Sequence, residues 1–345
     1  MIWNFHIAIE LLLGFLTLIL SGYGAYVAYK ILNRQNMGEK TQNYEKEREN
    51  FYYLLSMIAV ILLVSRILNV FYFYYVLVSL IPIIPGAMCP YGVLDASLPS
   101  IGFLDLIAKL IVPFAYGAWI LIDYINKRTE KLVLTHFLGK FYILGMFPLL
   151  LVDSGLDWIY FWFMEPIEVN CCRNVYNEAF NYNPINILGP ETALIVFLIT
   201  MALLAIIIFL QFFRDWNQFF LLGSVILAVL TAPLFLVALQ EFISPVWITI
   251  SKRILEQPLG EPHHCPFCLV KRWWSMIPFL LAVWIGLASV GWQGIIKSIT
   301  RDSIEIKEKA QPVLRNLQLT NLISLISGFL ILIGHIIFFF IINAI

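Results

Sequence analysis

The segment with the clearest chemical potential is 263–268, His-His-Cys-Pro-Phe-Cys, which contains a Cys-X-X-Cys pair. At the start of a helix, the first sulfur of such a pair lies near unpaired backbone N–H groups, which stabilise the thiolate. Lys271 and Arg272 follow closely and add to this effect. Thiol–disulfide exchange needs one attacking and one resolving sulfur. The spacing therefore predicts that Cys265 attacks and Cys268 resolves.

The same segment supports a metal site as an alternative. Its two imidazoles and two thiolates are donors that suit tetrahedral zinc or copper(I). They belong to His263, His264, Cys265 and Cys268. Adjacent histidines point in different directions in most backbones, so we expect only one of the two imidazoles to bind an ion. In the redox interpretation, either imidazole assists proton transfer instead.

All five cysteines fall in loops that we predict on the outer side of a membrane. They are Cys89, Cys171, Cys172, Cys265 and Cys268. Thiols are oxidised on that side, which leaves three interpretations open. Cys89, Cys171 and Cys172 relay electrons to the Cys-X-X-Cys pair, or extend a set of soft metal ligands, or form structural disulfides worth about 2–4 kcal/mol each. The odd number of cysteines argues against a fully paired scaffold.

The composition places these motifs in a membrane protein. Hydrophobic residues make up 61% of the 345-residue chain and charged residues only 13%, with no formal net charge. Soluble domains carry about 25% charged residues. A water-soluble globule, a disordered chain and a nucleic-acid-binding protein are therefore excluded, and the lipid bilayer is the expected surrounding. The sequence contains no P-loop and no glycine-rich nucleotide fingerprint, which excludes ATP-driven transport within this chain.

Long apolar runs predict an all-α bundle of about eight transmembrane helices, because roughly 20 apolar residues span the hydrocarbon. The predicted spans lie near 5–31, 51–75, 101–125, 132–153, 191–213, 218–241, 273–296 and 319–343. After the second span we expect an interfacial segment with Pro82 and Pro85. After the fourth we expect an outer loop over 153–190, in which 158–163 lie along the membrane surface.

Basic residues between the predicted spans set an orientation. The loops after the odd-numbered spans hold fourteen Lys and Arg residues, and the loops after the even-numbered spans hold five. The positive-inside rule then places both termini outside the plasma membrane, which is the inner membrane of a double-membraned bacterium.

Two similar tripeptides indicate that the chain consists of two halves. Cys89-Pro90-Tyr91 matches Cys265-Pro266-Phe267 in pattern, and each tripeptide follows the second span of a four-span half. This match predicts two parallel four-helix repeats, 1–176 and 177–345, related by an axis along the membrane normal. A chance match remains the alternative because the matching segments are so short.

Some ionisable residues fall within the predicted spans, where charge is costly. Asp105 and Lys109 share one helix face and are expected to neutralise each other. Arg66 has two interpretations: a counter-ion for an anionic ligand or a quinone oxygen, or a salt bridge to an acidic side chain of another span. Glu10 lies toward the end of the first span, where we expect it to extend to the membrane surface.

These observations favour an integral membrane thiol–disulfide redox protein, linked to a quinone and acting on a periplasmic thiol protein. In general plan the chain resembles the quinone-linked disulfide-forming membrane enzymes, which keep a Cys-X-X-Cys at the outer end of a helix bundle. Those cores have four helices, whereas this chain is twice as large and carries the motif elsewhere. The alternatives are an outward-facing copper or zinc handling protein served by a metal carrier, and a non-catalytic subunit that assembles with other membrane subunits.

Overall fold

The protein is all-α in the part of the chain that its computed structural model describes. The described residues are 4–36, 42–87, 89–98, 101–129, 132–165, 190–213, 276–301 and 303–344, with the isolated residues 223, 226, 227 and 230. The helices are α1 (Phe5–Asn36), α2 (Gln42–Leu80), α3 (Pro90–Leu94), α4 (Ile101–Asn126), α5 (Thr135–Phe141), α6 (Phe147–Trp162), α8 (Pro190–Phe213), α12 (Met276–Ile299) and α13 (Ile304–Ala344), and a π-helical segment, η1 (Tyr142–Met146), joins α5 to α6.

Five helical segments within these residues are long and apolar enough to cross a membrane. They are Phe5–Asn33, Lys46–Leu80, Ile101–Asn126, Thr135–Trp162 and Ile277–Ile299. The chain is therefore a multi-pass membrane protein in contact with the lipid bilayer. The predicted spans 191–213 and 319–343 fall within the helices α8 and α13, and 218–241 lies almost wholly outside the described residues.

The chain divides into two compact units. The first unit comprises 1–171 with 302–310, and the second comprises 172–301 with 311–345. In the second unit, Leu204 of α8 and Val290 of α12 are buried together, and Leu325 of α13 packs against them. The predicted division into the repeats 1–176 and 177–345 stays a prediction.

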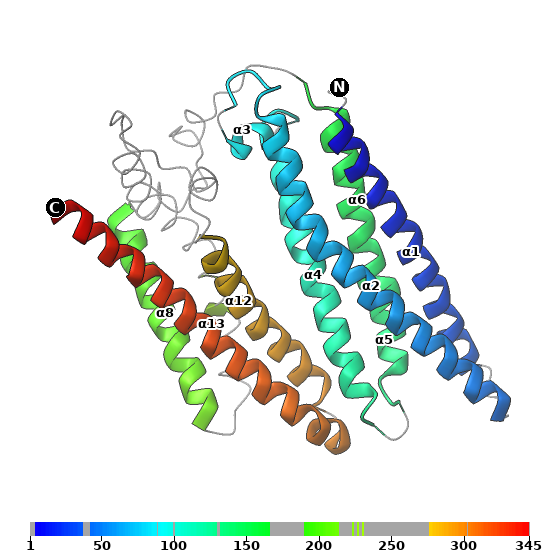
Figure 1. Ribbon diagram of the computed structural model, residues 1–345. Helices are drawn as coiled ribbons and strands as arrows, with labels where there is room; N and C mark the ends of the chain where they lie inside the picture. Colours follow the sequence, from blue (N-terminus) through cyan, green and yellow to red (C-terminus); the bar gives the residue numbers. More distant parts are fainter. Residues whose placement is uncertain are drawn as a thin grey trace. The chain divides into compact units, whose positions relative to one another are not determined.

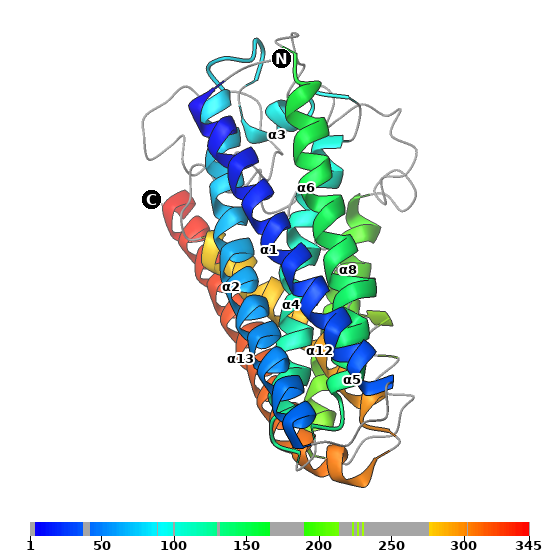
Figure 2. The ribbon, with the colours of Figure 1, turned by 90° about the vertical axis from the view of Figure 1, so that its right-hand side faces the viewer.

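The first unit is a closed bundle of four long helical segments. In Figures 1 and 2, α1, α2, α4 and the continuous segment α5–η1–α6 run side by side, and each packs against two neighbours. The short helix α3 lies at the end of the bundle where the chain begins (Figure 1). The chain reaches α3 through the turn containing Pro82 and Pro85, where Gly86 has a φ of 78°, a left-handed conformation that favours glycine.

Polar side chains point into this bundle and large apolar side chains point out. On α4, Asp105 and Lys109 are at most 2% exposed, whereas Leu104 and Ile107 are each 51% exposed. Lipid solvates the apolar surface, so the usual arrangement of a soluble bundle is reversed along this face. Polar groups in the interior must then find their partners within the protein.

The fourth predicted span ends too early. The helix continues to Trp162, so 153–162 do not begin an outer loop. The prediction that 158–163 lie along the membrane surface is therefore wrong for 158–162, which continue the candidate span. Asp153 and Asp157 looked like loop residues because a carboxylate is costly within a span. Both are buried and face basic partners on neighbouring helices, which removes the reason to end the span there.

Close packing of α3 against α4 depends on Gly102. A Cβ atom there would lie 2.3 Å from the Leu94 carbonyl oxygen and 2.9 Å from Cε2 of Tyr160. We expect Gly102→Ala to lower the free energy of unfolding in detergent by about 1–3 kcal/mol, since backbone must move to make room. Gly155→Ala is the matched control, because no atom lies within 4 Å of its Cβ position. Equal stability of the two variants would contradict this packing.

Candidate functional site

A cluster of charged side chains occupies the interior of the first unit, and each of the four long helical segments contributes to it. We call it the carboxylate centre. It consists of Glu10 from α1, Arg66 and Asn69 from α2, Asp105 and Lys109 from α4, and Asp153 and Asp157 from α6. On α2, α4 and α6, the two members that share a helix are three or four residues apart, so both side chains point to the same side of that helix. The helix periodicity thus directs all of these groups to one place.

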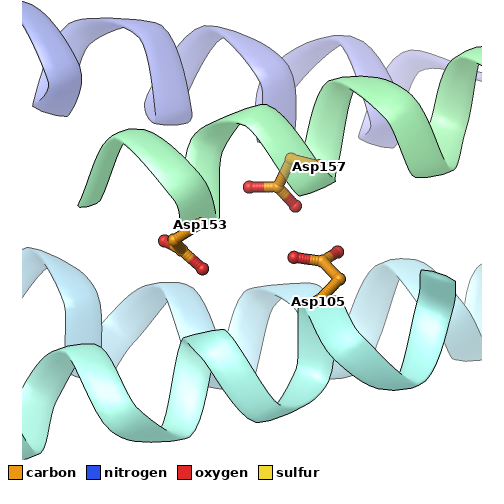
Figure 3. A group of neighbouring side chains, drawn as sticks. All are labelled: Asp105, Asp153 and Asp157. Carbon is orange, nitrogen blue, oxygen red and sulfur yellow. The ribbon is translucent and has the colours of Figure 1, made fainter. Parts of the chain in front are cut away.

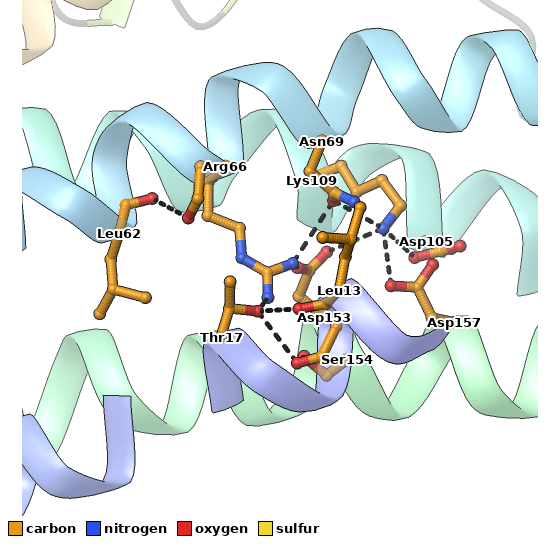
Figure 4. Close-up of polar contacts among 12 residues, drawn as sticks. Leu13, Thr17, Leu62, Arg66, Asn69, Asp105, Lys109, Asp153, Ser154 and Asp157 are labelled. Carbon is orange, nitrogen blue, oxygen red and sulfur yellow. Dashed lines mark hydrogen bonds and ion pairs between the residues drawn. The ribbon is translucent and has the colours of Figure 1, made fainter. Parts of the chain in front are cut away.

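Lys109 is the hub of the carboxylate centre (Figure 4). Its Nζ atom lies 2.8 Å from Oδ2 of Asp157 and 3.2 Å from Oε1 of Glu10. It also donates a hydrogen bond of 3.2 Å to Oδ1 of Asn69. Carboxylate oxygens of Asp105 and Asp153 each lie 3.8 Å away. One ammonium group therefore faces all four acidic side chains.

Arg66 provides the second positive charge. Its Nη1 atom donates a 2.7 Å hydrogen bond to Oδ2 of Asp153, and its Nη2 atom contacts the Thr17 hydroxyl of α1. Asn69 links the two halves of the cluster, because its amide donates to Glu10 at 2.8 Å while its Oδ1 accepts from Lys109 and Arg66. The four helices are thus tied together by one continuous polar network.

The acidic groups of the centre outnumber the basic groups by two. Four carboxyl groups face one lysine and one arginine, and each of these six side chains is at most 2% exposed. Several buried oxygens have no hydrogen-bond partner among the described residues: Oε2 of Glu10, both Oδ atoms of Asp105, Oδ1 of Asp153 and Oδ1 of Asp157. Excess negative charge in a low dielectric is strongly unfavourable. Two further positive charges would neutralise it, supplied either by two protons or by a bound cation.

A metal ion is one candidate for the missing positive charge. Asp105, Asp153 and Asp157 each offer an oxygen, and these three atoms lie within 4.8 Å of one another (Figure 3). The ammonium of Lys109 already lies beside this group, however, and the Arg66 guanidinium contacts Asp153. Both would repel an additional metal cation. The two bases also oppose protonation, but each proton brings a single positive charge and needs no further ligands, whereas a metal ion needs a larger set of ligands.

A second polar cluster lies at the opposite end of the first unit from α3. This terminal cluster consists of Tyr52, Ser56, Asp123, Asn126 and Lys127. Asp123 accepts hydrogen bonds from Tyr52 and Ser56 and forms a 2.8 Å ion pair with Lys127. Asn126 bonds to the Tyr52 hydroxyl at 3.0 Å. One acid is matched by one base here, so the terminal cluster carries no charge excess.

Only two of the eight residues that the sequence analysis places in a site, Cys89 and Arg66, lie among the described residues. Cys171, Cys172, His263, His264, Cys265 and Cys268 lie outside the described residues. Cys89 is fully buried and directly precedes Pro90 at the start of α3, the end of the bundle where the chain begins. Arg66 is buried, and its ion pair with Asp153 matches the second of its two interpretations. A quinone at Arg66 stays a prediction.

Three acidic members of the centre were missed by sequence reasoning. Glu10 does not reach the membrane surface, because it is fully buried against Lys109. Asp153 and Asp157 fall within the predicted outer loop 153–190. The signal that could have found the last two is their spacing of four residues, the same as that of Asp105 and Lys109, which predicts two helix faces able to pair. The expected pairing of Asp105 with Lys109 is confirmed at 3.8 Å.

No protein-family model, curated protein or solved structure matches the chain. The chemistry of the carboxylate centre is therefore inferred from its geometry.

Removing the Lys109 side chain should lower the free energy of unfolding far more than removing an exposed lysine. We expect Lys109→Met to lower the free energy of unfolding in detergent by about 3–5 kcal/mol, because it leaves buried carboxylates without their main counter-charge. The control is Lys140→Met, which removes an exposed lysine of α5 and should cost about 0.5 kcal/mol or less. Similar losses in the two variants would show that Lys109 is not the hub.

Proposed function

We propose that the chain is a multi-pass membrane protein that binds and exchanges protons at the carboxylate centre of its first unit. The observation that carries the proposal is the excess of two buried carboxyl groups over basic groups among its members. Ionisable groups buried within membrane spans commonly serve proton or ion pathways. A purely structural ion-pair network would be expected to balance its charges, as the terminal cluster does.

The geometry explains why protons suit this centre. Asp105 has no hydrogen bond to a described residue through either carboxylate oxygen and faces the carboxyl groups of Asp153 and Asp157 (Figure 3). Two neighbouring carboxylates that share one proton are more stable than two charged ones, because like charges at this range repel strongly. Lys109 and Arg66 lower the cost of the charge that remains. The centre can therefore gain or lose a proton without unpairing its bases.

We also propose thiol–disulfide exchange at Cys265 and Cys268, for which the Cys-Pro-Phe-Cys motif is the supporting observation. Oxidation of a dithiol to a disulfide releases two electrons and two protons, and reduction of a quinone to a quinol takes up the same number. Electrons would pass from partner thiols through Cys265 and Cys268, with Cys89, Cys171 and Cys172 as relays, to a quinone beside Arg66. Proton exchange at the carboxylate centre would serve the quinone half of this reaction.

The finer topology is part of the same proposal. We place eight spans in the plasma membrane, arranged as two parallel four-helix repeats with both termini outside. Copper or zinc handling by His263, His264, Cys265 and Cys268 is the alternative for the outer motif. A non-catalytic role in a larger membrane complex is the third. A periplasmic thiol protein, a metal carrier or other membrane subunits would be the respective partners.

Infrared spectroscopy can test the proton proposal directly. The purified protein at neutral pH should show a carbonyl band of protonated carboxylic acid that is weakened in Asp105→Asn and in Asp157→Asn. Asp123→Asn is the matched control, because it removes a buried carboxylate that already pairs with Lys127. The acid band should be unchanged in this control.

Two outcomes would contradict the proposal of proton binding. The first is the absence of an acid band that responds to Asp105 or Asp157. The second is a metal ion that remains in stoichiometric amount after chelator washing and is lost in Asp105→Asn, since it would neutralise the carboxylates in place of protons.

The redox proposal predicts a trapped intermediate. In Cys268→Ala, the Cys265 thiolate can still attack the disulfide of the oxidised partner, the reverse of the first exchange step, and releases one partner thiol. The mixed disulfide that forms cannot be resolved, so it should accumulate and be visible as a higher-mass species on a non-reducing gel. Cys265→Ala should not accumulate it. If Cys268→Ala oxidised partner thiols to disulfides at the wild-type rate, without a mixed disulfide, the assignment would be wrong. Metal retained by the wild type and lost in Cys265→Ala would favour copper or zinc handling instead.

A further inference from the structure

We propose that Ser21, Tyr116 and Tyr142 form the proton-access route to the carboxylate centre, on the side that faces the terminal cluster. This inference rests on the proposed function, because it concerns how protons reach that centre. We call these three residues the hydroxyl cluster. They come from α1, α4 and η1 and are buried in the interior of the first unit.

The Tyr142 hydroxyl is the unusual member of the hydroxyl cluster. Tyr142 is fully buried, and its hydroxyl lies close enough to those of Ser21 and Tyr116 to interact with both, although it forms no hydrogen bond of ordinary geometry with a described residue. A buried polar group without a well-formed hydrogen bond is unfavourable, so its retention calls for an explanation. The phenol is accommodated because position 24 is a glycine: a Cβ atom there would lie 2.3 Å from the Tyr142 hydroxyl oxygen.

The backbone around Tyr142 is also irregular. Tyr142 begins η1, the π-helical segment inserted between α5 and α6. Such insertions are rare and are often found at functional sites, since they displace the side chains that follow from the regular helical register. Here η1 brings the Tyr142 ring to 6.5 Å from the ring of Tyr116 and 6.1 Å from that of Trp119. Local distortion and a hydroxyl without a well-formed hydrogen bond to a described residue thus coincide at one residue.

The hydroxyl cluster is adjacent to the carboxylate centre. Oγ of Ser21 lies 3.2 Å from the Tyr116 hydroxyl. Tyr116 is close enough to Arg66 and Asp153 of the centre for their charges to act on its hydroxyl. The Thr17 hydroxyl, which contacts Arg66, is not part of the route, because it already donates to the Leu13 and Gly14 carbonyl oxygens. A hydroxyl group can accept a proton on its oxygen while it donates its own. A proton that moves along this series leaves each hydroxyl neutral, so the relay needs no other reactant.

Along the helices, the hydroxyl cluster lies between the terminal cluster and the carboxylate centre. On α4, Asp105 and Lys109 are followed by Tyr116 and then by Asp123 of the terminal cluster; on the segment α5–η1–α6, Tyr142 precedes Asp153 and Asp157. On the other side of the centre, toward α3, lies Tyr160, whose hydroxyl donates a 2.7 Å hydrogen bond to the Val93 carbonyl oxygen. That hydrogen bond engages its only proton, so Tyr160 is a poor relay and a suitable control.

The test measures how fast the carboxylic-acid band of the full-length protein exchanges to its deuterated form after transfer to heavy water. Tyr142→Phe removes one oxygen that forms no hydrogen bond of ordinary geometry with a described residue, so the variant should fold. We expect exchange to slow roughly tenfold to a hundredfold, with the equilibrium amplitude of the acid band unchanged. Ser21→Ala should slow it as well. Tyr160→Phe should leave the exchange rate as in the wild type.

The outcomes separate this inference from the proposed function. An acid band whose exchange is as fast in Tyr142→Phe and Ser21→Ala as in the wild type would overturn the relay and leave proton binding intact. Slower exchange in Tyr160→Phe alone would also overturn the relay, because access would then come from the α3 side. The absence of an acid band that depends on Asp105 or Asp157 would instead refute the proposed function itself.

Discussion

A charged group inside a lipid-embedded bundle must find its counter-charge within the protein, and this constraint governs the first unit. Lys109 satisfies it by facing four carboxyl groups from α1, α4 and α6. Arg66 adds a second contact, between α2 and α6. Lipid does not drive apolar helices together, so polar contacts of this kind, with van der Waals packing, determine which helices associate. The ion pairs therefore help to determine which helices associate, and the helix arrangement in turn brings each charge to its partner.

The incomplete balance of these charges is what suggests function. A network built only to hold helices together gains from pairing every acid with a base, and Asp123 with Lys127 shows that this chain can build such a pair. The carboxylate centre keeps two acids more than its bases can match. Buried polar groups without partners are unfavourable, and this imbalance is the basis of the proposal that protons bind at the centre. The Tyr142 hydroxyl, which forms no hydrogen bond of ordinary geometry with a described residue, belongs to the same pattern.

Sequence reasoning found the class of fold but only part of the site. Apolar runs are long and local, so they identified the first four spans and that near Ile277–Ile299, and helix periodicity predicted that Asp105 lies beside Lys109. Glu10, Asp153 and Asp157 were misassigned because a carboxylate in an apolar run looks like a helix end unless its distant partner is known. The partners of Asp153 and Asp157 are Arg66 and Lys109, far away in sequence, and no local pattern shows that they meet. The π-helical segment at Tyr142 likewise has no signal in the local sequence.

The most direct measurement of the central claim is a double-mutant cycle on Lys109 and Asp157, read as the free energy of unfolding in detergent. The Nζ atom of Lys109 lies 2.8 Å from Oδ2 of Asp157, so the two side chains should be energetically coupled. We predict that Lys109→Met costs less stability when Asp157→Asn is already present, with a coupling energy of about 0.5–3 kcal/mol. Strictly additive effects of the two substitutions would contradict a bundle held together by this buried ion pair.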